Sequence, residues 1–373
     1  MLHPSPRPSA EFNTPAPHPD LVRYALSPQG VMQILRIDDP RWTEFVGACP
    51  DATPFHNSAW TTLLSECYRY PTFALGVADA DGRLAAGAPV IAVERPLGGR
   101  RWVSLPFTDH CPVLSRPGRS DAVIRLAMSL REEREARVLS AIDVHADLPA
   151  LPGVHRSLHG VRHTLSLSAD PGEVFDKFKS MHRRNVRRAQ RSNLEIDFGR
   201  SAKDMHTFYR LHLQTRRRLG VPIQPRRFFS LLTTRLLAGG MGFVVSARLR
   251  ETPIAAAVFL HWNGALIYKY GASDPRFWEL RPNNQLFWAA IQWGCEQGFR
   301  TLDWGRSDTE DVGLRAFKSG WGATEEPLTY ASIGSPRSGA ARGKLQSTLS
   351  SIVRRSPPWV CQVLGEVLYR YVA

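Results

Sequence analysis

The chain has 373 residues, of which 43% are hydrophobic and 22% are charged, and its net charge at pH 7 is +14. This length exceeds one ordinary domain and points to about two, and the globular composition excludes a chain without a hydrophobic core. The positive charge favours an anionic partner such as nucleic acid, a phosphorylated substrate or acidic lipid. The alternative is a bias of the coding sequence, because nearly all the cations are arginines.

The cysteines and the first residues bear on the cellular location. Five cysteines are scattered without a CxxC pair or a metal-ligand spacing, which favours a reducing compartment and argues against a disulfide framework or a metal site. Residues 1–29 are rich in proline and lack the apolar segment of a signal peptide, so we expect a disordered leader. No apolar run approaches the length of a membrane span. These features predict a cytoplasmic protein.

The first predicted domain, residues 30–168, alternates short strands with amphipathic helices. Helices are expected at 40–48, at 58–68 and from residue 120, with Ser58 and Ser120 as N-caps. Asp81 and Gly82 form a turn signal that predicts a hairpin. Strands are expected at 33–37, 72–77, 84–93, 102–105, 139–144 and 163–167, with a loop at 106–112.

The second predicted domain, residues 169–333, repeats this order with different residues. The expected elements are helices at 173–191, 203–219 and 226–237, a meander of strands at 242–249, 253–262 and 265–271, a buried helix at 284–297, a strand at 301–304, a short helix around Lys318 and a strand at 328–333. Helices before a meander, then strand, helix and strand, form the order of a GNAT-type acyltransferase. The sequence therefore predicts an α/β fold of tandem GNAT-like domains, each with a mixed, mostly antiparallel sheet flanked by helices.

Residues 334–373 differ from both halves. A linker rich in serine, glycine and arginine at 334–343 precedes two apolar stripes at helical spacing, within 345–353 and 360–371. One interpretation is that 345–373 lies at a membrane interface, which would place the protein at the inner face of the membrane. The other is a helix docked on the protein's own core or on a partner protein, which Glu366 and the scarcity of cations in the last stripe favour.

The stretch 302–323 (LDWGRSDTEDVGLRAFKSGWGA) contains the first candidate for a reactive site. A short apolar strand breaks at Gly305 into a polar loop, and Lys318 follows in a short helix among aromatic residues and glycines. Only six lysines occur in the chain, so a lysine in such a turn is expected to face an anion. Lys318 suits the stabilisation of an oxyanion, because preorganised cationic donors are often the largest catalytic contribution. The alternative is an ion pair with a carboxylate of the loop 308–311.

A basic run extends from Lys177 to Arg191, with eight basic side chains and no acidic one. Like charges so close together repel unless an anion lies nearby, so a phosphate-bearing acceptor or tRNA is expected there. The alternative is a solvated helix face. The predicted contacts to the anion are Lys179, His182, Arg183 and Arg187.

Five segments follow one another in an order that is shared with a known family. They are SLPFTDHCPVL at 104–114, the basic helix FKSMHRRNVRRAQR at 178–191, KYGAS at 269–273, LDWGRS at 302–307 and FKSGWG at 317–322. In this order and spacing they resemble the Fem-type (FemAB-like) peptidyltransferases and their GNAT-like relatives, including exopolysaccharide-associated members. The resemblance covers roughly residues 30–333.

The resemblance implies transfer of an acyl or aminoacyl group to an amine of a cell-envelope, peptidoglycan or exopolysaccharide precursor. It implies no bound cofactor, an activated donor that is aminoacyl-tRNA or acyl-CoA, an anionic glycan or peptide acceptor, and a functional lysine at Lys318. Two departures concern the donor. The helical arm of some Fem enzymes, associated with tRNA binding, has no room between Arg191 and Leu194, and the segment 281–285 lacks the glycines of the CoA pyrophosphate turn.

Further site residues are expected around Lys318. Asp303 is interpreted either as the acceptor of the amine's proton or as a side chain that holds Arg306. Ser307 either touches the substrate or caps its own loop. Tyr270 either lines the site or belongs to the core. The loop 106–112 of the first half either contacts the acceptor or is only structural. The remaining predicted substrate contacts are Arg306, Lys269, Tyr270 and Asn284 in the second half and Asp109 and His110 in that loop.

Together these features predict an N-acyltransferase that works through orientation of its substrates and oxyanion stabilisation, without a metal or a covalent intermediate. Two other functions stay open on sequence alone. One is a non-catalytic binding protein for an anionic glycan or lipid-linked precursor, which need not retain both Asp303 and Lys318. The other is a tRNA- or RNA-binding accessory protein, whose binding should depend on the basic helix and weaken steeply with salt.

Overall fold

The computed structural model describes residues 32–95, 99–335, 350–351 and 353–372. The predicted leader at 1–29 and most of the predicted linker at 334–343 lie outside these ranges. Among the residues within them, no helix combines the length and the apolar character that crossing a bilayer requires.

The first half is built on an antiparallel meander that one helix joins to a parallel strand. The meander consists of β2 (Thr72–Ala78), β3 (Leu84–Arg95) and β4 (Gly99–Ser104). Helix α3 (Ser120–Ala136) leads to β6 (Ala141–Val144), which pairs in parallel with β4. The flanking elements are β1 (Gln33–Leu35), α1 (Pro40–Ala48), α2 (Ser58–Tyr68) and β5 (Leu114–Ser115).

The second half repeats this arrangement. Its meander consists of β9 (Gly242–Leu249), β10 (Thr252–Trp262) and β11 (Ala265–Ser273), and α8 (Pro282–Glu296) leads to β12 (Thr301–Ser307), which pairs in parallel with β11. The flanking elements are α4 (Pro171–Asp176), α5 (Ser180–Gln190), β8 (Glu195–Gly199), α6 (Ala202–Leu219), α7 (Arg226–Leu232), the π-helix η2 (Thr233–Leu237), the 3-10 helix η3 (Pro275–Leu280) and α9 (Val312–Ser319). The predicted tandem α/β fold is confirmed.

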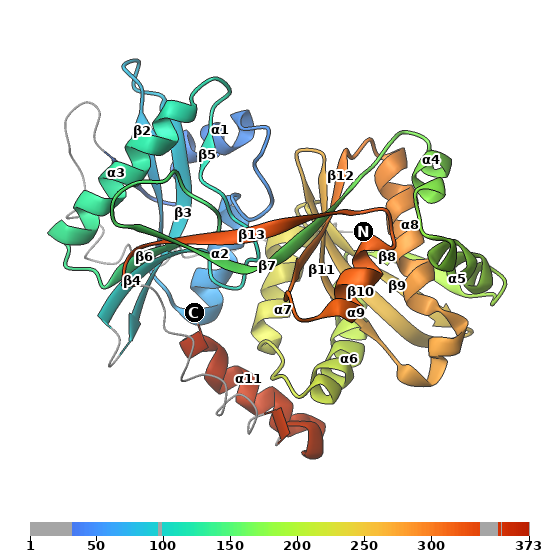
Figure 1. The fold of residues 1–373 in the computed structure, drawn as a ribbon. Coiled ribbons are helices and arrows are strands. Elements are labelled where there is room, and N and C mark those ends of the chain that lie inside the picture. The colour runs from blue at the N-terminus through green and yellow to red at the C-terminus, as the bar shows by residue number, and fades with distance from the viewer. Residues whose placement is uncertain (1–31, 96–98, 336–349, 352, 373) are drawn as a thin grey trace, which may run out of the picture.

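The two halves exchange their last strands. β7 (Val154–Ser166) ends the first half but pairs with β12 of the second. β13 (Thr324–Gly334) ends the second half but pairs with β6 of the first, and β7 and β13 pair with each other. One sheet therefore runs through both halves in the order β1-β2-β3-β4-β6-β13-β7-β12-β11-β10-β9-β8, and Figure 1 shows β7 and β13 crossing between the halves.

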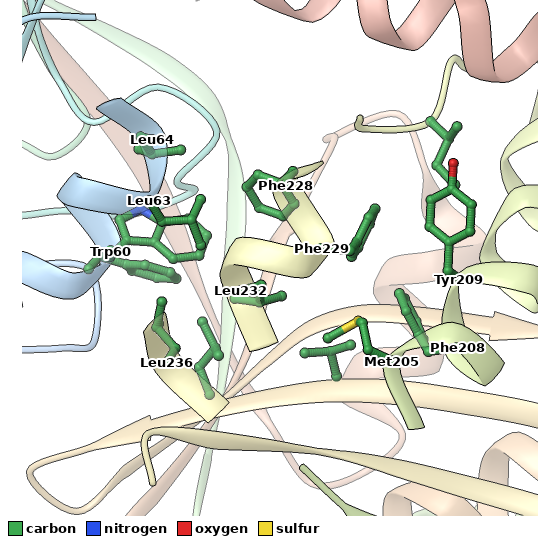
Figure 2. Packing of buried hydrophobic residues seen from close by; sticks show 14 of the residues in the cluster. Trp60, Leu63, Leu64, Met205, Phe208, Tyr209, Phe228, Phe229, Leu232 and Leu236 are labelled. Atoms are coloured by element: carbon green, nitrogen blue, oxygen red, sulfur yellow. The ribbon is translucent and has the colours of Figure 1, made fainter. Parts of the chain in front are cut away.

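A hydrophobic core also spans the junction. Trp60 and Leu63 of α2, from the first half, lie against Phe228 and Leu232 of α7 from the second (Figure 2). The Trp60 and Phe228 rings meet edge to face with centroids 6.0 Å apart, and all four side chains are fully buried. Each large apolar side chain buried in this way stabilises the fold by about 1.5–3 kcal/mol. The shared core and the exchanged strands hold the two halves as one body.

The last helix, α11 (Pro358–Val372), docks on α6 of the same chain. Arg216 of α6 donates a hydrogen bond to the Tyr369 hydroxyl (2.9 Å), and the Arg226 amide donates one to the Glu366 carboxylate (3.0 Å). A Cβ at Gly365 would lie 1.8 Å from the Ile223 carbonyl oxygen, so this close approach requires glycine. The tail helix thus packs on the protein's own body.

Some local predictions were wrong. The helix predicted at 173–191 is broken between α4 and α5, because Phe178 turns into the core and the Lys179 amide bonds the Gly320 carbonyl (2.8 Å). Asn57, and not Ser58, caps α2, and no side chain caps α3 at Arg119. The predictions missed β8, an edge strand with mostly exposed residues that shows no alternation.

Candidate active site

The sheet opens where the parallel strands β11 and β12 diverge. They pair at only three positions, of which the last is Ile267 with Asp303. Just beyond, β11 has a bulge at Lys269, which has no partner on β10. A bulge re-aims the side chains around it, and here Tyr268 and Tyr270 pack into cores on opposite faces of the sheet. Lys269 therefore stands at the point of divergence.

β12 has a bulge of its own directly after Asp303. Asp303 pairs with Thr164 of β7 and the next pair is Arg306 with Arg162, so two residues of β12 oppose one of β7. One of the two is Gly305, whose φ of +69° is strained for any other residue. This turn of the backbone brings the Gly305 amide to the Asp303 carboxylate, at 2.7 Å.

Asp303 is held on both of its carboxylate oxygens. Oδ1 accepts the hydrogen bond from Gly305, and Oδ2 accepts one from Arg162 Nε (2.9 Å) in an ion pair that is mostly buried. The predicted contact of Asp303 with Arg306 is not formed. Arg306 instead donates to the His159 carbonyl (2.5 Å) and pairs with Asp308, because its position after the bulge turns it to the outer rim. Both oxygens of the Asp303 carboxylate are therefore engaged within the protein.

Lys318 of α9 is buried, with 4% of its surface exposed. Its ammonium donates hydrogen bonds to the carbonyls of Gly305 (3.0 Å) and Arg306 (2.8 Å), so it closes the turn that follows Asp303. The alternative of an ion pair with the loop 308–311 is not met, since Lys318 forms no ion pair with a carboxylate in the part of the chain that the structure describes. Burial lowers the pKa of Lys318 to about 8, although the carboxylates of Asp109, Asp303 and Asp311 favour its charged form.

Lys269 is the second cation of the site and lies among aromatic rings. Its ammonium donates to the Phe107 carbonyl (2.8 Å) and sits 5.0 Å from the ring centroid of Phe55 and 5.5 Å from that of Trp60. Burial lowers the pKa of Lys269, and nearby Asp109 and Asp303 oppose that shift. Cation–π contact and a carbonyl thus compensate for the loss of water around the charge.

The loop of the first half brings Asp109 to the second half. Its carboxylate oxygen lies 3.0 Å from the point where a Cβ on Gly305 would stand, so glycine is needed there for space as well as for conformation. The Tyr330 hydroxyl of β13 donates to the Asp109 carbonyl (2.5 Å). Asp109 therefore meets β12 across the junction of the two halves, and its contact with an acceptor stays a prediction.

Two residues of this loop have strained backbone conformations, and hydrogen bonds from neighbouring elements hold the loop in place. Leu105 and Phe107 have φ of +53° and +63°, conformations that cost free energy in residues with side chains. His56 Nε2 bonds the Pro112 carbonyl (2.9 Å), and the Trp60 indole donates to the Thr108 hydroxyl (3.1 Å). Contacts from the surrounding body thus compensate for the strain.

His110 lies beside Arg162, with 3.4 Å between its Nδ1 and the guanidinium. Burial and, as the second cause, the positive charge of Arg162 lower the pKa of His110 to about 3. His110 is therefore neutral at physiological pH and can accept a hydrogen bond from Arg162. Arg162 pairs with Asp303 and His110 lies beside Arg162, so the first half supplies more than one side chain to this cluster.

Arg306 borders an open pocket of about 630 Å³ on the outer side of the same turn. His159 and Gly160 of β7 form one wall, and the loop 308–311 forms the other. Because Lys318 binds the Arg306 carbonyl, the pocket and the buried lysine lie on two sides of one peptide segment. A substrate in the pocket would therefore be close to the charged cluster.

The other predicted contacts of the second half are buried. Tyr270 packs among Phe208, Phe228 and Phe229, which agrees with the alternative of a core residue. The remaining two, both at most 6% exposed, are Asn284 in the first turn of α8 and Ser307 at the end of β12.

The predicted anion contacts on α5 divide into two groups. His182 is 1% exposed and packs against Phe317 and Trp321 in the core, and its contact with an anion stays a prediction. Arg183 donates to the Asp176 carbonyl (2.9 Å), while Arg187 is exposed and lies over the Phe175 ring. The exposed basic side chains of this helix and its flanks are Lys177, Lys179, Arg184, Arg187, Arg188 and Arg191.

Sequence reasoning missed three contributors to the cluster. Arg162 and Tyr330 come from the exchanged strands, and Phe107 contributes only its backbone carbonyl to Lys269. Arg162 lies between Val161 and His163 in β7. A charged residue between an apolar and an aromatic neighbour was the one feature of the sequence that could have indicated a functional side chain there. The carbonyl of Phe107 has no signal in the sequence.

Comparisons with known proteins agree with this architecture. Residues 176–319 match the family model of the acetyltransferase (GNAT) domain. The matched region identifies the second half as a GNAT-type acyltransferase domain, and the chain as a whole has a Fem-like fold. The matched region contains Lys269, Asp303 and Lys318, whereas Asp109 and Tyr330 of the same cluster lie outside it.

Solved structures similar to this acyltransferase cover most of its chain. FemX superposes with a TM-score of 0.67 at 15% identity, covering 85% of this chain and 100% of FemX. A domain assigned as the C-terminal domain of a lysylphosphatidylglycerol synthetase of Agrobacterium fabrum reaches 0.52 at 13%, covering 84% and 95%. A tandem GNAT protein from the clavulanic acid biosynthesis pathway reaches 0.50 at 12%, covering 82% and 100%. At these identities the likeness shows the fold. No curated protein matches the sequence significantly.

Proposed function

We propose that this acyltransferase forms an amide by moving an acyl or aminoacyl group from an activated donor to an amine of a cell-envelope, peptidoglycan or exopolysaccharide precursor. The observation that carries the proposal is the buried ammonium of Lys318 at the turn Gly305–Arg306, with two carboxylates beside it. Such a cluster of opposite charges in a mostly buried junction fits acyl transfer better than passive binding, because it can serve both the oxyanion and the amine.

Lys318 is proposed to stabilise the tetrahedral oxyanion. An ammonium has three donor hydrogens, and the described residues account for two, at the Gly305 and Arg306 carbonyls. The third is available to the carbonyl oxygen of the donor. Because those two bonds hold Lys318 in place before the reaction, it needs little reorganisation when negative charge develops.

Asp109 is proposed to receive the proton of the attacking amine. Both oxygens of Asp303 are engaged, whereas the Asp109 carboxylate accepts no hydrogen bond from the described residues and faces the same turn. The amine nitrogen forms a bond to the acyl carbon, and the bond to the donor oxygen or sulfur breaks. The proton released by the nitrogen passes through Asp109 to the leaving group, so that Asp109 is regenerated.

The similar structures and the basic side chains of α5 bear on the donor and the acceptor. FemX and the protein called lysylphosphatidylglycerol synthetase share the fold, and the second name favours an aminoacyl group and an envelope lipid or peptide as substrates. The exposed arginines of α5, Arg184, Arg187 and Arg188, support contact with the phosphates of tRNA or of a phosphorylated precursor. We therefore propose aminoacyl-tRNA or acyl-CoA as the donor.

Mass spectrometry of envelope glycans and precursors tests the proposal. Cells that carry the gene are compared with cells that lack it, and the latter are complemented with the native chain, with Lys318→Met or with Lys203→Met. We expect an acyl or aminoacyl mass increment with the native chain and with Lys203→Met, whose lysine is exposed on α6. The increment should be absent in the deletion strain and with Lys318→Met.

Two results would count against the proposal in different ways. An increment that survives with Lys318→Met removes the lysine from the mechanism but keeps the acyltransferase. Precursors that are identical with and without the gene remove the envelope acceptor. Purified protein incubated with acetyl-CoA or with charged tRNA and the modified precursor then distinguishes the two donors by which one is consumed.

A further inference from the structure

The last helix, α11, has two apolar faces, and only one of them is covered. Cys361, Gly365 and Tyr369 face the body of the protein, where the Cys361 thiol donates to the Val221 carbonyl and Tyr369 lies at Arg216. A second set, Trp359, Val363 and Val367, is 62%, 51% and 56% exposed. We call this second set the outer stripe.

The outer stripe is a continuous helical feature. Its members are four residues apart, and a rotation of about 100° per residue places all three within a sector of about 80° opposite Gly365. Figure 1 shows α11 along the lower edge of the molecule, with the body of the protein on its other side. Three large apolar side chains in a row on one exposed helix face are unusual for a soluble surface and mark an interaction site.

Exposed arginines lie before α11 and next to its Glu366. Arg354 and Arg355 precede the helix, and Arg354 also donates to the Leu219 carbonyl (3.3 Å). Arg226 and Arg227 are exposed at the start of α7, where the Arg226 amide meets Glu366 of the helix. The one acidic residue of the helix, Glu366, accepts the Arg226 amide (3.0 Å), so its charge is engaged at the surface of the body. The local balance around the stripe is therefore positive.

We propose that the outer stripe and its arginines dock this protein on an anionic lipid surface, with α11 lying in the plane of the interface. Trp359, at the first turn, is a side chain that favours the boundary between headgroups and acyl chains. Valines insert shallowly, and arginines reach anionic headgroups while their stems cover apolar surface. Docking of this kind would keep a soluble enzyme close to lipid-linked molecules.

A second copy of the chain is a poorer occupant of the stripe. A stable protein interface buries about 800 Å² on each partner, and three side chains on one narrow helix face supply only a fraction of that. Two copies that met through this stripe would also bring their arginine groups together, where like charges repel. An anionic bilayer, by contrast, satisfies the apolar stripe and the arginines at once.

Vesicle flotation with the full chain tests the proposal. Vesicles of phosphatidylcholine with about 30% phosphatidylglycerol are compared with pure phosphatidylcholine, at low and at physiological salt. The variants are Val363→Asp in the stripe, Arg354→Glu/Arg355→Glu beside it, and Val138→Asp as the matched control. Val138 is 85% exposed and lies in the first half, so Val138→Asp makes the same substitution at an exposed site away from α11.

We expect the native chain and Val138→Asp to float with the anionic vesicles and Val363→Asp to remain unbound. The double arginine variant should bind at least about fivefold more weakly, and salt should weaken the native chain in the same direction. Equal flotation of the native chain and Val363→Asp, or no flotation of either, overturns the proposal. It is also overturned if sedimentation shows a native dimer that Val363→Asp converts to a monomer. Unchanged thermal unfolding of the variants confirms that they fold.

Discussion

Each half of the protein places an aspartate at the same point of the same strand arrangement, but the surroundings of the two differ. Asp143 of β6 pairs with Val103 of β4, and Asp303 of β12 pairs with Ile267 of β11. In the first half Arg101 binds both oxygens of Asp143, at 3.0 and 3.1 Å, and the pair is buried. In the second half Asp303 shares its neighbourhood with two lysines and a carboxylate from the other half.

The difference comes from the backbone. β4 and β6 pair at four consecutive positions without a register shift, so the parallel strands stay together. β11 and β12 pair at three positions and then separate, where bulges occur at Lys269 and around Gly305. A duplicated fold can thus stay closed in one copy and open in the other through single extra residues in its strands. Among the described residues, the cluster of Lys269, Lys318 and their neighbouring aspartates lies at the opening of the second copy.

The largest expected effect concerns the closed copy. Arg101→Met leaves the buried Asp143 carboxylate without its partner and should lower the free energy of unfolding by about 3–5 kcal/mol. The neighbouring Arg100→Met removes an exposed pair with Glu94 and should cost at most about 1 kcal/mol. Urea unfolding measures both. If both variants lose the same free energy of unfolding, the buried Arg101–Asp143 pair does not stabilise the first half more than an exposed pair does. The contrast drawn between the two aspartates would then be wrong.

In the second half, the expected effect of a substitution is on the rate of transfer. Lys318→Met keeps the length of the side chain and removes the charge, so we expect the rate of transfer to fall by about 100- to 1000-fold. Lys203→Met serves as the control with unchanged rate. Both are measured with the donor and acceptor that mass spectrometry identifies. A Lys318→Met enzyme within a few-fold of the native rate would show that the opened strands do not serve the chemistry through this lysine.

The pH dependence sharpens the same point. Burial holds the pKa of Lys318 at about 8, so its ammonium predominates below that pH and is lost above it. Because the proposed oxyanion role requires the charged form, the rate should fall by about tenfold for each pH unit above 8. The folded protein also holds this proton less tightly than the unfolded chain, so this lysine makes the fold more stable as pH rises from about 8 to 10.5.

Measurement of kcat and of urea unfolding between pH 7 and 10 distinguishes these trends. Lys318→Met should flatten both, relative to the native chain. A rate that keeps rising through pH 9 in the native enzyme would indicate a neutral lysine in the active form, and the oxyanion role would then be withdrawn.

The smallest effect isolates the bulge of β12. Gly305→Ala adds the strain of a positive φ, about 1–2 kcal/mol, and a methyl group that meets Asp109 at 3.0 Å. Gly298→Ala has a similar φ of +73° and open space around its Cβ. Both should lower the free energy of unfolding, but only Gly305→Ala should also reduce the rate of transfer. Equal rates for the two variants would mean that the position of Asp109 is unimportant.

Local patterns made much of the fold predictable. The spacing of apolar residues marked α1, α6 and β9 to within one residue, and the order of elements predicted the duplication. The prediction of α5 failed at its start, where Phe178 turns into the core and a backbone bond to Gly320 breaks the helix. Contacts of that kind depend on residues more than a hundred positions away.

The candidate site was predicted in part for the same reason. The polar residues at the end of β12 and the lone lysine after it are visible in the sequence, and the structure places Lys269, Asp303, Lys318, Asp109 and His110 in one cluster. Their roles in catalysis stay predictions. Arg162, Tyr330 and the carbonyl of Phe107 could not be found, because the exchange of β7 and β13 and the strained loop bring them there.

The sequence by itself determined the types of the elements, their order in two similar halves and the chemical groups available to a site, since these depend on spacing and residue type within short windows. The tertiary structure decided where the parallel strands separate, which strand crosses to which half, and which arginine pairs with each aspartate, Arg101 with Asp143 and Arg162 with Asp303. Those outcomes depend on strand register and on long-range pairing, where one unpaired residue changes the direction of every side chain that follows.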